Sequence, residues 1–420
     1  MLRTCSFWFL VTAACSASAA SPEIAFKDLN GRAVHLSAPA HSTVTLPMPA
    51  GPTFVTVQQG VQGLSGMHDA THNNLPTMLL PQIFPALSKV RHDINRGSGF
   101  VPNVESLLEI QPDMVWQWGH MGQELLAPIE AAGLTVGALR YGTEENTQQW
   151  ITLFAQSTGH PERGQTMNAW RQQVRHEVEA QVADIAPSKR LKVMHLSRYK
   201  TGLAVAGQAG NFQADIGIAG GYNVNDSKAG APIVNVEQLL LWNPDMIVLT
   251  NFEHDLKPET LYSDPMLASL TAIQQQRVYK VPAGGYYWDA PSQDSPLYWI
   301  WLAKLMYPDA VTLDLRAEMR RAYQMLYGHA VTDAQIDQAL HLRVNRSSQS
   351  YAHIFERSAE PGSPAARLHR LPTLPTAVNP NCLHVCCEIC TCPAVDAFGA
   401  GLVGQHVVSA GHWPLLGGPG

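Results

Sequence analysis

Cysteine is missing from the whole central part of the chain. The sequence has seven cysteines: Cys5 and Cys15 lie near its start, and the other five lie within residues 382–392. Residues 16–381 therefore cannot contain a disulfide framework or a metal site built from thiolates.

Three further absences narrow the class of protein. The sequence has no Gly-rich phosphate-binding loop and no GxSxG motif, so it lacks the usual signatures of nucleotide binding and of hydrolase chemistry. Its 28 basic and 34 acidic side chains are interspersed and give a net charge of −6. We therefore expect no nucleic-acid partner. After residue 20 no apolar run reaches the roughly 18 residues of a membrane span, so we expect a soluble mature chain.

Residues 1–20 are typical of a secretory signal peptide. Arg3 precedes an apolar run over residues 7–14, and small residues follow through Ala20. We expect cleavage after Ala19 or Ala20 and a periplasmic location. Cys15 is a partial match to a lipoprotein cleavage motif, so a lipid anchor at this residue is the alternative.

An internal repeat is the strongest pattern in the sequence. Residues 103–115, NVESLLEIQPDMV, recur 132 positions later as NVEQLLLWNPDMI, and eight of the thirteen positions are identical. Each copy predicts a short helix that begins at Asn103 or Asn235, stops before Pro112 or Pro244, and leads into a buried strand. The chain is therefore expected to have two similar α/β halves.

The rest of the chain fits around this repeat. An alternating pattern over residues 23–36 predicts a β-hairpin. Strand signals at residues 44–46, 64–67, 114–116 and 134–138, and again at 192–196, 246–249 and 278–281, predict mostly parallel sheets with covering helices. Apolar residues at three- and four-residue spacing predict one long helix over residues 162–185, with Arg171 and Arg175 off its apolar side. Amphipathic helices are expected from residue 297 to about 327 and over 333–342.

The predicted organisation has five parts. They are a signal peptide (1–20), an N-terminal lobe (21–160), an inter-lobe helix (161–187), a C-terminal lobe (188–355) and an irregular tail (356–420). The tail has no lysine after residue 356, is rich in Gly and Pro, and contains the five clustered cysteines. Their spacing is not a paired zinc motif, so an unstructured or aberrant extension is preferred over a metal site.

Residues 22–355 resemble the helical-backbone metal receptors, a family of periplasmic binding proteins of ABC transporters. The repeat, the spanning helix and the export signal support the resemblance, as do residues 26–34, 218–224, 288–291, 301–304 and 307–309. It implies two α/β lobes, a ligand cleft between them and one long connecting helix. It also implies a monomer without enzymatic activity or intrinsic cofactor, which carries a metal complex to a permease dimer in the inner membrane.

The resemblance leaves the cargo open. A ferric siderophore or related iron chelate is expected first, with a nickel or cobalt chelate, haem, cobalamin or molybdate as alternatives. The family's permeases commonly dock an acidic residue on each lobe, and residues 73–90 contain none. The second lobe offers Asp255, Glu259 and Asp264.

Loops after the strands are the expected walls of the cleft, because ligands of open α/β sheets bind beyond the carboxyl ends of strands. Aromatic and cationic side chains there suit a large, partly apolar metal complex. The candidates are Trp118, Arg140, Tyr199, Tyr286, Tyr287 and Trp288. The alternative for each aromatic is a place in the core, and for Arg140 a structural role.

Three histidines lie in the same loops. His68, His120 and His254 are candidates to ligate the metal or to hydrogen-bond its chelator. A second hypothesis is an exported metalloenzyme that uses these histidines with Asp69 or Asp255. It leaves the two-lobe repeat unexplained.

Overall fold

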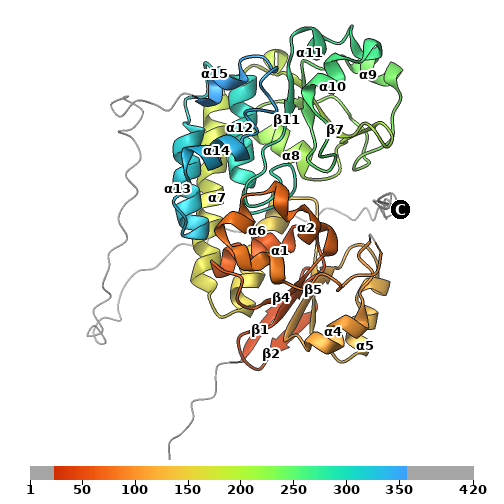
Figure 1. Ribbon diagram of the computed structural model, residues 1–420, viewed down its shortest axis with the longest axis vertical. Coiled ribbons are helices and arrows are strands. Elements are labelled where there is room, and N and C mark those ends of the chain that lie inside the picture. Colours follow the sequence, from red (N-terminus) through yellow and green to blue (C-terminus); the bar gives the residue numbers. More distant parts are fainter. Residues whose placement is uncertain (1–22, 98, 357–420) are drawn as a thin grey trace, which may run out of the picture.

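The protein has two α/β lobes joined by a long helix, as Figure 1 shows. This computed structural model describes residues 23–97 and 99–356. The predicted signal peptide, Cys15 and the cysteine-rich tail lie outside these residues. The predicted fold class is confirmed.

The first lobe contains a four-stranded parallel sheet in the order β4-β3-β5-β6, beside the separate antiparallel hairpin β1-β2. Its elements are β1 (Ile24–Lys27), β2 (Ala33–Leu36), β3 (Thr43–Thr45), α1 (Ala50–Gln58), β4 (Leu64–Met67), α2 (Asp69–Asn74), α3 (Leu80–Ile83), α4 (Val104–Ile110), β5 (Met114–Trp118), α5 (Ala127–Ala131), β6 (Val136–Leu139) and α6 (Glu144–Ser157). The hairpin lies where the alternation predicted it.

The second lobe repeats this plan with a sheet in the order β11-β10-β7-β8, in which β9 also pairs with β7 and only β8 is antiparallel. Its elements are β7 (Lys192–Arg198), β8 (Ala204–Val205), α8 (Asn211–Ile218), β9 (Tyr222–Asn223), α9 (Val236–Trp242), β10 (Met246–Leu249), α10 (Pro258–Tyr262), α11 (Thr271–Gln274) and β11 (Val278–Lys280).

The sequence repeat is a structural repeat. Helices α4 and α9 each end in a left-handed residue, Gln111 (φ 52°) and Asn243 (φ 40°), and the proline follows directly. A buried strand, β5 or β10, comes next. The start differs, since the Asn235 side chain accepts the Gln238 amide N–H whereas Asn103 makes no such cap.

Helix α7 (Pro161–Val182) is the predicted connecting helix. Its buried side is formed by Met167, Trp170, Val174, Val178 and Val182, at the predicted spacing. Arg171 was expected off this side, but its side chain is completely buried. Its hydrogen bonds, described below, explain why a charge is tolerated there.

The C-terminal helices lie along α7 (Figure 1). They are α12 (Ser295–Met306), α13 (Leu315–Tyr327), α14 (Asp333–Ala339) and α15 (Tyr351–Glu356). Helix α12 was expected to be amphipathic, but all of its residues except Lys304 are buried because it packs on α7, α8 and α13. Helix α13 also contacts α1, so the chain returns to the first lobe after completing the second.

Candidate functional site between the lobes

The segments that follow strands of the two sheets meet between the lobes. The Leu79 N–H donates to the Gly284 carbonyl oxygen (2.8 Å). The Tyr287 hydroxyl lies 3.1 Å from Oγ1 of Thr77. A small apolar cluster surrounds these bonds and contains Met78, Ala283, Tyr286, Tyr287 and Ala290, with Phe252 packed against it. The predicted candidates Tyr286 and Tyr287 therefore lie on the contact surface between the lobes.

The loop after β11 reaches this surface because it follows α13 very closely. A Cβ atom on Gly285 would lie 1.9 Å from the Tyr327 hydroxyl, so only glycine fits. Asp294 then fastens the loop by accepting the Gly285 N–H (2.6 Å), the Trp288 ring N–H (3.2 Å) and the Tyr327 hydroxyl (2.5 Å). Burial raises the pKa of this carboxyl group.

His254 also bridges the lobes. Its Nε2 lies 2.9 Å from Oδ1 of Asn74 and its Nδ1 lies 3.4 Å from the Tyr287 hydroxyl. Partial burial, and secondarily the charge of Lys280, lower the pKa of His254. The neutral ring is therefore favoured at neutral pH, the form that could bind a metal.

Trp118 and His120 lie at the facing edge of the first lobe. Trp118 is buried, and its ring packs against those of His120 (5.2 Å) and Tyr141 (6.1 Å). His120 is half-buried, its Nδ1 has no hydrogen-bond partner, and burial lowers its pKa. These side chains form an aromatic wall with one neutral imidazole.

The remaining candidates in the first lobe make their polar contacts within that lobe. His68 is completely buried at the start of α2, where Nδ1 accepts the Ala70 N–H (3.1 Å) and Nε2 lies 3.1 Å from the Gly99 carbonyl oxygen. Arg140 is exposed and donates to Oδ1 of Asn30 (3.2 Å) beside the N-terminal hairpin.

Two candidates in the second lobe, Tyr199 and Trp288, also make their polar contacts within their own lobe. Tyr199 donates its hydroxyl hydrogen to Asp264, and burial followed by this carboxylate raises its pKa. Trp288 is completely buried in the largest core cluster and bonds Asp294.

A buried polar cluster lies at the inner end of this surface and was missed by the sequence prediction. Asp289 is completely buried, its Oδ2 lies 3.4 Å from Nε2 of His195, and the Asn251 N–H donates to the same oxygen (3.4 Å). Within residues 23–97 and 99–356, neither Oδ1 of Asp289 nor Nε2 of His195 has a hydrogen-bond partner. The 3.4 Å approach of His195 is thus a close contact without hydrogen-bond geometry.

Asp215 is the second buried carboxyl group of this cluster. It accepts the Trp299 ring N–H (2.6 Å) and an N–H of the Asn211 amide (3.1 Å). Burial raises its pKa to about 7. Asn211 also accepts the Tyr141 hydroxyl of the first lobe (2.5 Å) and donates to the Asp289 carbonyl oxygen (3.3 Å). This amide therefore connects both lobes to the cluster.

One sequence signal could have indicated this cluster. His195 is a polar residue in the otherwise apolar start of strand β7, KVMHL, where burial demands a partner. Asp289 falls in segment 288–291, which supports only the family resemblance, and Asp215 lies on helix α8 with no distinguishing pattern. The described ranges, 23–97 and 99–356, contain no group of three or more His, Cys, Asp or Glu side chains placed to hold a metal ion.

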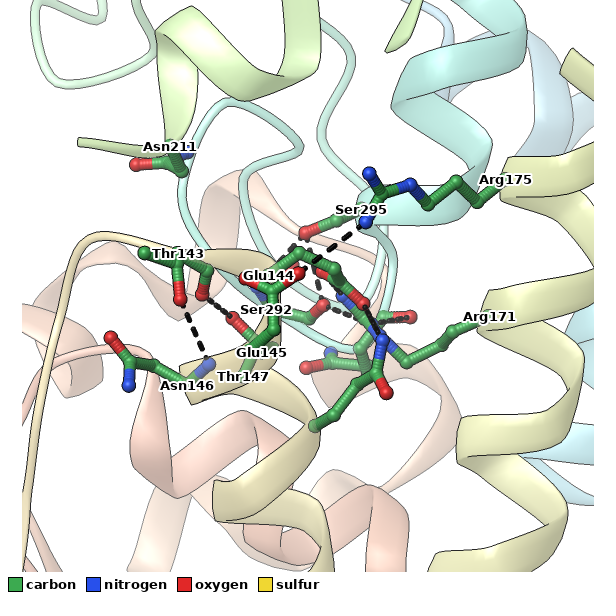
Figure 2. Close-up of polar contacts among 12 residues, drawn as sticks. Thr143, Glu144, Glu145, Asn146, Thr147, Arg171, Arg175, Asn211, Ser292 and Ser295 are labelled. Carbon is green, nitrogen blue, oxygen red and sulfur yellow. Dashed lines mark hydrogen bonds and ion pairs between the residues drawn. The ribbon is translucent and has the colours of Figure 1, made fainter. Parts of the chain in front are cut away.

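Arg171 joins both lobes through α7, and Figure 2 shows its surroundings. It bonds the buried Glu144 of α6 through two N–H groups (2.7 and 2.5 Å). A third N–H donates to the carbonyl oxygens of Ser292 (2.7 Å) and Gln293 (3.3 Å) in the second lobe. Beside it an open groove of about 420 Å³ is lined by Gly142, Thr143, Glu144, Glu145, Arg175, Gln208, Gly210, Gln213 and Ala214.

No helix within residues 23–97 and 99–356 has the length and apolar character required to cross a membrane.

Comparisons with known proteins agree with this architecture. A family model described as periplasmic binding protein matches residues 60–284, more than half of the chain. The molybdate-binding protein MolA of Haemophilus influenzae is 24% identical over 248 residues, which cover 54% of this chain and 70% of MolA.

Two further proteins are similar. The iron-uptake system-binding protein of Bacillus subtilis is 25% identical over 190 residues, 44% of this chain and 59% of that protein. The crystal structure of a periplasmic solute binding protein from Veillonella parvula superposes with a TM-score of 0.71 at 25% identity, covering 77% of this chain and 99% of that one.

Proposed function

The chain belongs to the periplasmic binding protein family, and on that premise we propose that it captures a metal complex outside the cytoplasm and delivers it to an ABC permease. A ferric siderophore or related iron chelate is the cargo that we place first. The protein acts in the periplasm as a monomer without catalysis, and its partner is a permease dimer in the inner membrane. Anchoring by a lipid at Cys15 remains part of the proposal.

The contact surface between the lobes is the observation that carries this proposal. Tyr286 and Tyr287 of one lobe face the strand-end segments of the other, with His254 bridging. Separation of the lobes would expose the phenol groups of Tyr286 and Tyr287 and the imidazole of His254 on the second lobe, and these groups suit a partly apolar chelate. The aromatic wall of Trp118 and His120 lies on the first lobe at the same strand-end edge.

The matched relatives are named for different cargoes. The relative from Bacillus subtilis is described as an iron-uptake protein and that from Haemophilus influenzae as a molybdate-binding protein. Nickel or cobalt chelates, haem, cobalamin and molybdate are therefore the alternatives. An exported metalloenzyme is disfavoured because the matched relatives are binding proteins and His68 is committed to backbone contacts.

Two binding measurements, fluorescence titration and calorimetry, test the proposal. The ligands are ferric siderophores, haem, nickel–histidine, cobalamin and molybdate. One complex should bind, and Tyr287→Phe should weaken its binding, because the Tyr287 hydroxyl, which separation of the lobes releases from Thr77, is lost as a partner for the cargo. Tyr199→Phe is the matched control, since that hydroxyl bonds Asp264 within one lobe. If none of the complexes binds the folded protein, the proposed function is wrong.

A further inference from the structure

The buried polar cluster of Asp215, Asp289, His195 and Asn211 has more acceptor capacity than its neighbours use. Asp289 is completely buried, yet its Oδ1 accepts no hydrogen bond. A buried carboxylate oxygen without a donor is costly, because it loses its hydration and gains nothing in return. Such an atom is expected where a ligand supplies the missing donor.

The charges of Lys280 and Arg171 act on Asp289 and Asp215, respectively, but neither side chain forms an ion pair with these carboxyl groups. The Lys280 amine donates instead to the carbonyl oxygens of Thr250 (2.5 Å) and Glu253 (2.7 Å). Arg171 is paired with Glu144. Among residues 23–97 and 99–356, no Lys or Arg side chain forms an ion pair with Asp215 or Asp289. In the same described residues, His195 is the only basic side chain within ion-pair distance of Asp289.

The cluster lies where the first lobe meets the second. The Tyr141 hydroxyl of the first lobe bonds Asn211, which in turn bonds both Asp215 and the backbone of Asp289. The negative charge of Asp289 contributes to raising the pKa of Tyr141, behind burial and Asp215, and that of Tyr286, behind burial and other neighbours. Tyr141 and Tyr286 lie on the surface between the lobes, so the negative electrostatic potential of Asp289 extends to the proposed cargo site.

We propose that Asp289 is a specificity-determining residue that binds a positively charged, N–H-bearing group of the cargo and disfavours oxyanions, with His195 3.4 Å away. The inference rests on the proposed function. The cargo class is thus a metal complex whose chelator carries an ammonium or amine group. A bare oxyanion would bring negative charge next to the buried Asp289 carboxyl group, and like charges at such a site repel.

A matched pair of ferric trihydroxamates provides the most direct probe. Ferrioxamine B has a free ammonium group, and its N-acetylated form lacks that charge while keeping the same iron centre. We expect tighter binding of ferrioxamine B, and we expect Asp289→Asn to abolish the preference. A charged hydrogen bond of this kind corresponds to a loss of roughly 10- to 100-fold in affinity.

The control for charge is Asp309→Asn, which makes the same change at an exposed position after α12. Circular dichroism and thermal unfolding establish that Asp289→Asn is folded. If it is not, His195→Gln serves as the second variant, because it removes the imidazole that lies against Asp289 without removing the carboxylate. We expect His195→Gln to reduce the preference for ferrioxamine B.

The outcomes separate this inference from the proposed function. If the protein binds both ferrioxamines equally, or binds molybdate most tightly, the inference about charge is wrong while a receptor function stands. If another complex of the panel binds best, Asp289→Asn must weaken it, and unchanged affinity overturns the inference. If no complex binds to the folded wild-type protein, the proposed function fails as well.

Discussion

The two lobes share one architecture but present different chemistry to each other. The first offers the aromatic wall of Trp118 and His120, with the Tyr141 hydroxyl beside it. The second offers Tyr286 and Tyr287 together with the buried acidic cluster around Asp289. The repeated helix and strand set the position of the surface that each lobe presents to the other. The side chains of the loops that follow the strands determine the chemistry of that surface.

The largest expected effect concerns Arg171, which joins the two lobes. Arg171→Ala leaves Glu144 buried without its partner and frees the loop at Ser292. Removing one member of a buried ion pair costs about 3–5 kcal/mol. Urea denaturation should show this loss.

Arg175→Ala is the matched control for Arg171→Ala. Arg175 lies one turn further along α7, is 37% exposed and pairs with Glu179 at the surface. Exposed pairs of this kind contribute about 0–1 kcal/mol. Equal losses in the two variants would contradict the anchoring role of Arg171.

The stability of the protein should depend on pH through Asp215 of the buried acidic cluster, because burial raises the pKa of this carboxyl group to about 7. In the unfolded chain this carboxyl ionises near pH 4, whereas in the folded protein it keeps its proton until about pH 7. The folded state binds more protons between these values, so its stability falls as pH rises through this window.

Asp215→Asn should remove that part of the pH dependence. The shift corresponds to a few kcal/mol, on the order of 1.4 kcal/mol per pKa unit. Urea denaturation at a series of pH values from 4 to 8 measures it. If the wild-type protein and Asp215→Asn showed the same dependence of stability on pH, Asp215 would ionise at its ordinary pKa and the acidic cluster would be less buried than described.

The smallest expected effect concerns the hydrogen bond between His254 and Asn74, which joins the two lobes. His254→Ala removes the bond to Asn74, and one hydrogen bond contributes about 0.5–1.5 kcal/mol. We expect a loss of this size in the free energy of unfolding, measured by urea denaturation, because this bond joins the two lobes. Asn74→Ala should give the same loss, and the double variant should lose no more than either. Additive losses would show that the two side chains act separately.

The sequence predicted the elements more completely than it predicted the site. The repeat, the hairpin, the long helix and all seven predicted strands have counterparts in the structure, because their signals are local. Of the nine candidate side chains, Tyr286, Tyr287 and His254 contact the other lobe. Trp288 and Tyr199 carry the same aromatic signal but bond within the second lobe, because a strand-end position does not specify which way a side chain turns.

The sequence by itself determined two α/β units and their connecting helix, since helical periodicity, prolines and apolar strands act over short distances. Tertiary structure alone decided that Arg171 is buried and that His195, Asp215 and Asp289 share one site. These three residues lie on a strand, a helix and a loop that are distant in the chain. Their partners and their burial depend on packing between the lobes, which no local pattern records.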